Sequence, residues 1–353
     1  MDFSLTEDRQ MLSDSLTRYL REKYPMEARN AAAYAAPFHA PAHWEGLSEL
    51  GALFALAPEE AGGFGGSGFD ISVVFEALGG ALCPEPVLAA LMASRLLKAA
   101  DEDQEALLSG AVRYAVAIGE IDAWYDLGAI ETQAAPSGEG HALTGRKSVV
   151  YGGQVADKLL VAAQLDGKVA LFEVAAEAAS ITGYAMIDGG GAAEVVLEAA
   201  PARLLITDAG AALGDAVNAG IVALCSEAVG AMDALYAMTL DYLRTRKQFG
   251  VAIGQFQALQ HRAVDMLTEI EQARSITIKA AAELGGPDAG RYASMAKNLI
   301  GRAGRLVAEE AIQMHGGIAM TWEYPGSHYA KRLVMIDAQL GDTDYHLSRV
   351  MAA

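Results

Sequence analysis

A cationic, amide-rich segment at residues 244–250 is the part of the chain best equipped to bind a phosphate. Its sequence is RTRKQFG, and Arg246 within it offers a planar fork of donors with a permanent positive charge, which suits a pyrophosphate. Gln248 and Gln257 can donate hydrogen bonds, and Phe249 can lie against a ring. The alternative is a solvated basic helix end that stabilises the helix dipole. Taken alone, the segment favours that alternative.

A second segment, QMHGG at residues 313–317, also has two interpretations. Gln313 can bind a ligand, and the adjacent Gly316 and Gly317 allow a close approach of the backbone to a ligand. The same glycines can also end a helix, and both roles can coexist. His315, which lies between Gln313 and Gly316, is a lone histidine, which is more often a structural group than a catalyst.

Glu227 and Asp342 are two carboxylates whose surroundings can be predicted from the sequence. Glu227 lies in an apolar stretch, on a helix face shared with small residues at 220, 223, 230 and 234. A buried carboxylate is disfavoured in its charged form unless it is paired, and such groups cluster at active sites. A structural carboxylate between helices is the favoured interpretation for Glu227, and an N-cap before a short helix at 343–350 for Asp342.

Charge and cysteine usage exclude several classes of partner and site. The formal net charge of −19 argues against nucleic acid and anionic membranes as partners, although a locally basic pocket remains compatible with it. The two cysteines, Cys83 and Cys225, are far apart and lack metal-site spacing, so neither a disulfide nor a metal centre is expected. No uninterrupted apolar run of about 18 residues and no signal peptide are found. The sequence therefore predicts a cytoplasmic protein.

The helix and strand patterns along the sequence predict three domains that would position these residues. Residues 1–112 form an N-terminal helical domain, which opens with Thr6 ahead of acidic residues and continues with Leu12, Leu16 and Leu20 at helical spacing. A glycine-rich loop at 58–68 leads into the helix that begins near Asp70. No Gly-Lys-Ser/Thr ends this loop, so it is not a phosphate-binding P-loop.

Residues 113–205 predict a middle β-barrel-like domain, because short runs rich in Val, Ile, Leu and Ala alternate with glycine pairs and acidic turns. The clearest of these runs are 114–118, 147–151, 158–163 and 169–174.

Residues 206–353 predict a C-terminal four-helix bundle. Apolar residues recur every three or four positions after residue 209 and again after residue 256, and a third long helix spans about 288–314. A short final helix follows at 343–350. The fold class is therefore mainly α.

The chain resembles the acyl-CoA dehydrogenase family over essentially its whole length. The motifs that carry the resemblance are RTRKQFG followed by VAIGQFQALQ at 244–260, QMHGG at 313–317 and TWEYP at 321–325. Its sequence segments are most similar to those of the small subunit of the pimeloyl-CoA dehydrogenase type. The segments that show this are CSEAVGAMDAL at 225–235 and LGDTDYHLSRV at 340–350.

The resemblance implies an FAD enzyme that removes hydrogen from Cα and Cβ of an acyl-CoA thioester. In that chemistry a carboxylate takes the α-proton and the flavin accepts the β-hydride. It also implies an electron-transferring flavoprotein as electron acceptor, and an FAD site shared between neighbouring subunits. The residues that it assigns to FAD are Arg246, Gln248, Phe249, Gln257, Gln313, Gly316 and Gly317.

The chain departs from the family where the flavin ring and the catalytic base belong. The family's two middle-domain stretches beside the flavin correspond here to Tyr114–Ala117 and Val149–Tyr151. Val149 replaces a tryptophan, and the family's hydroxyl donors are missing from the first stretch. The usual base position falls on Leu340, and the alternative one falls near Gly220. Neither position carries a carboxylate, so Glu227 and Asp342, which lie near these positions, are the carboxylates to consider as a catalytic base.

These departures predict the small, partly degenerate subunit of a heteromeric acyl-CoA dehydrogenase, with a related large subunit as partner. A homodimer or homotetramer with a displaced base, a related flavoenzyme and a catalytically silent structural paralogue are the alternatives. Nothing in the sequence specifies the acyl group, because pocket shape depends on helix packing.

Overall fold

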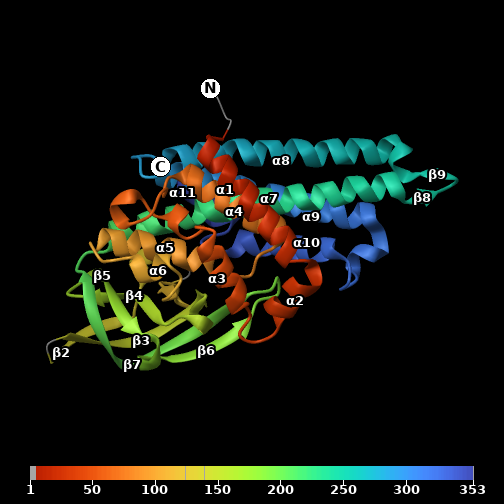
Figure 1. Ribbon diagram of the computed structural model, residues 1–353. Coiled ribbons are helices and arrows are strands. Elements are labelled where there is room, and N and C mark those ends of the chain that lie inside the picture. The colour runs from red at the N-terminus through yellow and green to blue at the C-terminus, as the bar shows by residue number, and fades with distance from the viewer. Residues whose placement is uncertain (1–4, 124, 139, 353) are drawn as a thin grey trace. The chain divides into compact units, whose positions relative to one another are not determined.

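A computed structural model describes residues 5–123, 125–138 and 140–352 (Figure 1). By the density of internal contacts the chain divides into two compact units, each described here by itself. The helical unit comprises Met1–Glu27, Gly68–Cys83 and Ile221–Ala353, and the sheet unit comprises Ala28–Ser67 and Pro84–Gly220. The three-domain boundaries expected from the sequence, at 112/113 and 205/206, stay a prediction.

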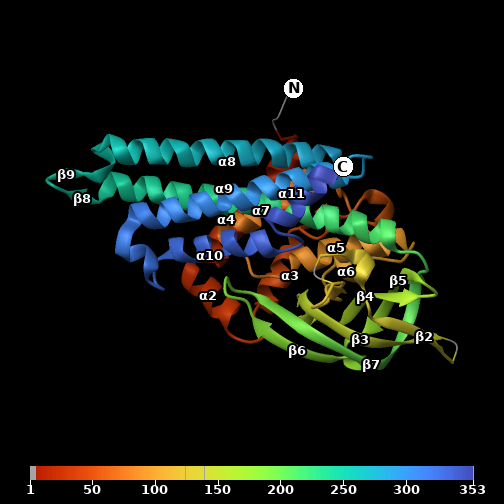
Figure 2. The ribbon, with the colours of Figure 1, turned by 180° about the vertical axis from the view of Figure 1, so that it is seen from behind.

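The helical unit is built on long helices that run side by side, with the β8–β9 hairpin joining α7 to α8 (Figures 1 and 2). Its elements are α1 (Glu7–Lys23), α4 (Gly68–Ala81), most of α7 (Gly210–Thr245), β8 (Lys247–Gln248), β9 (Val251–Ala252), η6 (Ile253–Gln255), α8 (Gln257–Glu283), α9 (Ala289–His315), η7 (Gly316–Met320), α10 (Pro325–Ala338) and α11 (Thr343–Ala352).

The predicted long helices are confirmed, and the N-terminus of α1 forms as expected. The Thr6 side chain accepts a hydrogen bond from the backbone N–H of Arg9, and Leu16 and Leu20 are buried. One helix, α10, was not expected. It begins with a proline in its first turn and buries Tyr329, Leu333 and Ile336.

Glycines bring the backbones of α4 and α7 into direct contact. A Cβ at Gly79 would collide with the carbonyl oxygen of Glu227, and a Cβ at Gly230 would collide with that of Glu76. The small-residue face expected around Glu227 is thus a close helix–helix contact. Its consequence is that Glu227 is held between helices.

The sheet unit contains a closed β-structure, helices that precede it in the sequence and the first part of α7. Its elements are α2 (Met26–Tyr34), α3 (Pro41–Glu49), η1 (Phe54–Leu56), η2 (Glu59–Ala61), α5 (Val87–Ala99), α6 (Glu105–Leu108), β1 (Tyr114–Ala117), η3 (Leu127–Ala129), β2 (Gln133–Ser137), β3 (Gly140–Tyr151), η4 (Gly153–Val155), β4 (Lys158–Leu165), β5 (Lys168–Ala175), η5 (Ala176–Ala178), β6 (Ser180–Ala185) and β7 (Gly191–Ile206).

Strand pairing confirms the barrel-like prediction. The order β1-β4-β2-β3-β7-β5 is closed by an additional pairing of β4 with β5, and β6 pairs with β7. The interior is filled by a cluster that includes Leu143, Val150, Leu159, Phe172 and Val195. Closing the sheet leaves few exposed edges and gives the strands a fixed register.

Candidate active site

The residues predicted to bind FAD from the first motif lie on the connection between α7 and α8. Arg246 follows the last turn of α7, Gln248 ends β8 and Gln257 begins α8. All of them are exposed, and the Arg246 guanidinium makes no ion pair among the described residues. A cationic fork without a partner in a strongly acidic chain fits a ligand phosphate.

Phe249 lies at the tip of the hairpin and is 91% exposed. Its φ of +55° is left-handed, a conformation uncommon for residues other than glycine. The ring makes an edge contact with Phe256, with centroids 6.1 Å apart. An exposed aromatic ring in a left-handed conformation adds nothing to the core of this chain, which fits a role in binding.

The second predicted FAD segment lies at the end of α9, next to the end of α7. His315 is buried there between the rings of Tyr242 and Tyr324, with centroids 4.7 and 4.9 Å away. Its Nδ1 donates to the carbonyl oxygen of Ala311 at 2.7 Å, so the ring is part of the helix end. The structure thus brings the two motifs together, and His315 has the structural contact that the sequence favoured.

Gln313, Gly316 and Gly317 are exposed at this same end of the helical unit. Gly316 has a φ of +68°, and a Cβ at Gly316 or Gly317 would meet no atom within 4 Å. Packing within this chain therefore does not require Gly317 to be glycine. Open space beside a glycine backbone fits the close approach of a cofactor or a second chain.

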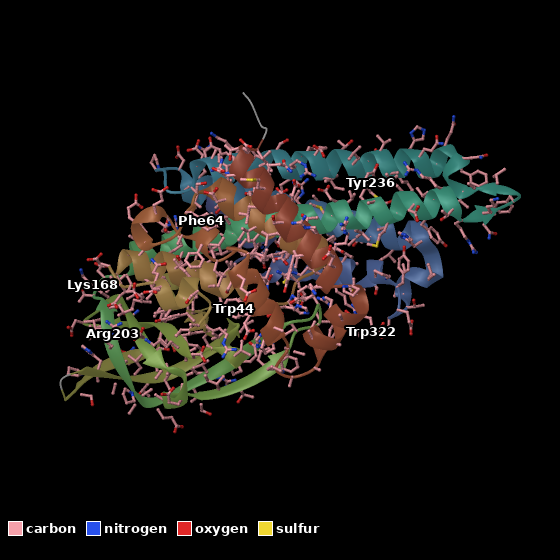
Figure 3. All side chains as sticks on the ribbon, viewed as in Figure 1. Trp44, Phe64, Lys168, Arg203, Tyr236 and Trp322 are labelled. Atoms are coloured by element: carbon pink, nitrogen blue, oxygen red, sulfur yellow. The ribbon has the colours of Figure 1, made fainter. Side chains whose placement is uncertain are left out.

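Large apolar side chains surround these residues on the surface. Trp322, labelled in Figure 3, is 51% exposed in the connection between η7 and α10. Ile318 and Met320 in η7 are also exposed. Such a group of exposed apolar side chains is typical of a protein–protein or ligand interface.

Glu227, the first candidate base, is engaged in a bidentate ion pair. Arg332 of α10 donates to its carboxylate through Nε at 2.6 Å and through a terminal nitrogen at 2.7 Å. Both side chains are largely buried. Both carboxylate oxygens are occupied by this guanidinium, so the geometry favours the structural role of Glu227.

Asp342, the second candidate, forms the N-cap that the sequence favoured. Its Oδ1 accepts a hydrogen bond from the backbone N–H of Tyr345 in the first turn of α11, at 2.8 Å. The catalytic base therefore stays unassigned in this chain.

The turn between α10 and α11, which contains Leu340, is fixed by side chains from elsewhere. The buried Lys297 ammonium donates to the carbonyl oxygens of Asp337 at 2.8 Å and Gly341 at 2.6 Å. His346 Nε2 donates to that of Leu340 at 3.0 Å. Leu340 itself has a φ of +55°. A left-handed leucine persists here because its neighbours hold both sides of the turn.

Burial sets the protonation of the groups that hold this turn. Burial lowers the pKa of Lys297 to about 8. Burial also lowers the pKa of His346 to about 4, and the nearby positive charge of Lys297 lowers it further. The folded protein therefore favours neutral His346, while the unfolded chain takes up the proton near pH 6.5. The stability from His346 is present above pH 6.5 and is lost as the pH falls from 6.5 towards 4.

We expect the free energy of unfolding to fall by on the order of 1 to 3 kcal/mol across this window. His346→Gln removes the titration, so its free energy of unfolding should depend less on pH between 6.5 and 4. Urea unfolding at several pH values measures this, with exposed His261→Gln as the control. An unchanged slope in His346→Gln would contradict the assignment.

The middle-domain stretches that flank the flavin in the family differ in exposure here. Strand β1 is buried along its whole length, and the Tyr114 hydroxyl donates to Glu173 at 3.2 Å. Val149, by contrast, is exposed on β3 with a φ of +52°. Of the two stretches, only the second has an exposed side chain.

Helix α7 is both long and strongly apolar. By length and composition alone it could cross a membrane, but 72% of its most apolar stretch is buried inside the protein. That burial is typical of a core helix. The predicted cytoplasmic location stays a prediction. Among the described residues no group of three or more His, Cys, Asp or Glu side chains could hold a metal ion.

Comparisons with known proteins agree with this architecture. The model of the acyl-CoA dehydrogenase N-terminal domain matches residues 6–111, and that of the C-terminal domain matches residues 211–353. The acyl-CoA dehydrogenase IpdE2 of Mycobacterium tuberculosis is 29% identical, over 92% of this chain and 91% of its own.

Two solved structures are similar along almost the entire chain. The ChsE4–ChsE5 complex from Mycobacterium tuberculosis is 27% identical with a TM-score of 0.90, covering 100% of this chain and 98% of the other. The Tcur3481–Tcur3483 steroid ACAD is 28% identical with a TM-score of 0.89. The match covers 98% of this chain and 97% of the other. With the FAD motifs gathered at one end of the helical unit, these matches show that the chain belongs to the acyl-CoA dehydrogenase family, the family of FAD-dependent oxidoreductases that act on CH–CH bonds.

Proposed function

We propose that this chain is the partly degenerate subunit of a two-component acyl-CoA dehydrogenase, and that it completes an FAD site formed mainly by a related large subunit. One observation supports this proposal most strongly. The two motifs lie together, yet every residue predicted to bind FAD is exposed. A site that its own chain leaves open requires a second chain to enclose the cofactor.

The chain's own residues have defined tasks in this site. Arg246 binds the pyrophosphate, Gln248 and Gln257 donate hydrogen bonds, and Phe249 packs against a ring. Gln313, Gly316 and Gly317 let the backbone approach the dinucleotide. When bound, FAD accepts the hydride from the β-carbon of the acyl-CoA.

Neither of the family's base positions carries a carboxylate, which favours a subunit that supports chemistry performed elsewhere. Leu340 is apolar, the Gly220 position has no side chain, and Glu227 is paired with Arg332. The base therefore comes from the large subunit. Two similar structures, ChsE4–ChsE5 and Tcur3481–Tcur3483, each carry two component names, which supports this arrangement. We further propose an electron-transferring flavoprotein as the acceptor.

Native mass spectrometry after co-expression with the product of the adjacent gene tests this proposal. We expect a heteromer that retains FAD, and little FAD on this chain purified alone. A homodimer or homotetramer that binds one FAD per chain and desaturates acyl-CoA by itself would contradict the two-component assignment. It would favour a homo-oligomeric enzyme with a displaced base.

A further inference from the structure

Within the helical unit, α4 is fixed against both α7 and α8 by direct backbone contacts. A Cβ at Gly230 of α7 would collide with the carbonyl oxygen of Glu76 in α4. A Cβ at Gly68 of α4 would collide with the carbonyl oxygen of Ala281 in α8. Glycine permits both contacts because it has no side chain. The backbone at Glu76 therefore stays next to α7 as long as these helices remain packed.

Beside this contact, one guanidinium is shared by carboxylates from three helices. Arg274 of α8 donates through one terminal nitrogen to both carboxylate oxygens of Asp233 in α7, at 2.7 and 2.8 Å. Its Nε lies 3.5 Å from the carboxylate of Glu271, also in α8. Its other terminal nitrogen lies 3.9 Å from the carboxylate of Glu76 in α4. Glu76 is thus the most distant of the three partners of Arg274.

The Glu76 carboxyl is poorly compensated as an anion. Among the residues that the structure describes, none donates a hydrogen bond to it, and 3.9 Å from Arg274 is too long for one. Burial raises the pKa of Glu76 from 4.5 to about 7. The charge of Arg274 opposes this rise, and the negative charge of Asp233 adds to it.

Charged groups on the other helices that touch α4 are engaged elsewhere. Arg9 of α1 pairs with Asp70 at 2.7 Å, and Glu227 of α7 pairs with Arg332 of α10. Tyr329 of α10 donates its hydroxyl to a backbone carbonyl oxygen at the end of α4. The charges that act on Glu76 are therefore those of the cluster itself.

We propose that Glu76, Asp233 and Arg274 form a pH-sensitive clasp between α4 and the α7–α8 pair. The clasp is closed while Glu76 carries a proton, because only Asp233 then needs the guanidinium. It loosens when Glu76 ionises, because two carboxylates then compete for one cation across a contact that has no room to relax. None of the three residues belongs to an FAD motif, so the inference is independent of the proposed function.

The sign of the effect follows from the direction of the pKa change. Folding raises the pKa of Glu76, so the stability from its neutral form is complete below pH 4.5 and is lost as the pH rises through 7. His346 acts in the opposite direction, because its contribution is lost as the pH falls towards 4. Glu76 is half-buried and His346 is buried, so solvent screens Glu76 more and its effect is the smaller.

Carbon-13 NMR of the full chain labelled at the glutamate carboxyl carbons measures the titration of Glu76, and Glu76→Gln identifies its signal. We expect a midpoint near pH 7. In Asp233→Asn, Arg274 is free to turn to Glu76, so the midpoint should fall to roughly pH 6 or lower. The matched control is Glu271→Gln, because Glu271 contacts the same guanidinium and does not act on Glu76. Its midpoint should stay near pH 7.

Hydrogen exchange measures whether ionisation loosens α4. At about pH 8, the backbone amides of α4 should exchange about fivefold faster in the wild type than in Glu76→Gln, and at about pH 5 the two proteins should agree. Amides of α9, which carries none of the three residues, are the reference and should differ little. The unfolding temperature of Glu76→Gln should also exceed that of the wild type by roughly 2 °C more at the higher pH.

Three results would overturn the clasp. A Glu76 midpoint near its ordinary 4.5 would show that it is ionised at neutral pH. An unchanged midpoint in Asp233→Asn would remove Asp233 from the cluster. Equal exchange of α4 in the wild type and Glu76→Gln at the higher pH, or equal acceleration of α4 and α9, would show that the ionisation does not act on this helix contact.

Discussion

Replacing Arg246 with alanine should release FAD from the complex without unfolding the helices. A charge-assisted, bidentate bond from a guanidinium to a phosphate contributes about 1.5 to 3 kcal/mol. The FAD dissociation constant should therefore rise roughly tenfold to a hundredfold. Because Arg246 is exposed and has no ion pair among the described residues, the unfolding temperature of the flavin-free protein should not change.

Arg244→Ala is the matched control for this experiment. Arg244 lies in the last turn of α7, is exposed and carries the same charge, so its loss changes the long-range electrostatics equally. Absorbance after gel filtration measures the flavin that each variant retains. Equal loss of FAD in both variants would show a general charge effect, and full retention in Arg246→Ala would refute the assignment of the pyrophosphate site.

Local patterns predicted most of the architecture. The helical periodicities around Leu16 and Leu20, and the strand runs at 147–151 and 158–163, formed the expected elements because each carries its own apolar face. Helix α10 was not predicted, although Pro325 is a good first residue for a helix. Its first turn also contains Gly326 and Ser327, which have weak helix propensity, so its stability comes from packing.

Contacts between distant positions could not be predicted from one sequence. The partner of Glu227, Arg332, is 105 residues away, and only folding reveals that the pair is bidentate. The left-handed conformations of Val149 and Leu340 were equally hidden, because valine and leucine are not residues that indicate a positive φ. Both are imposed by neighbours in space. The sequence therefore named a set of candidate residues, which stays a prediction, and it did not indicate the backbone strain.

The isolated chain should desaturate acyl-CoA poorly or not at all. The α-proton of a thioester is weakly acidic, and a positioned general base typically contributes a factor of roughly 10² to 10⁴. The chain, reconstituted with FAD, can be assayed against straight, branched, dicarboxylic and steroid side-chain acyl-CoA substrates with an artificial electron acceptor. Robust turnover would contradict the degenerate-subunit proposal.

Glu227→Gln and Asp342→Asn test the remaining carboxylates, but their effects on stability differ. Glu227→Gln leaves Arg332 buried without its charge partner, which should cost about 3 kcal/mol of folding free energy. Any loss of activity in this variant must therefore be compared with its unfolding temperature. Asp342→Asn keeps an N-cap and should be nearly neutral. Loss of turnover in Asp342→Asn with FAD still bound would identify it as the base.

Leu340→Glu offers the converse experiment. The α10–α11 turn is already held by Lys297 and His346 through backbone carbonyl oxygens, so a new side chain at 340 does not disturb the bonds that shape it. Glutamate should tolerate the left-handed conformation about as well as leucine does. If the resemblance places the base at this position, the variant should reduce bound FAD with an acyl-CoA at least tenfold faster than the wild type, measured anaerobically by bleaching of the flavin. Leu340→Gln, which has the same shape without the carboxylate, should show no gain, because only the charged group can accept the α-proton.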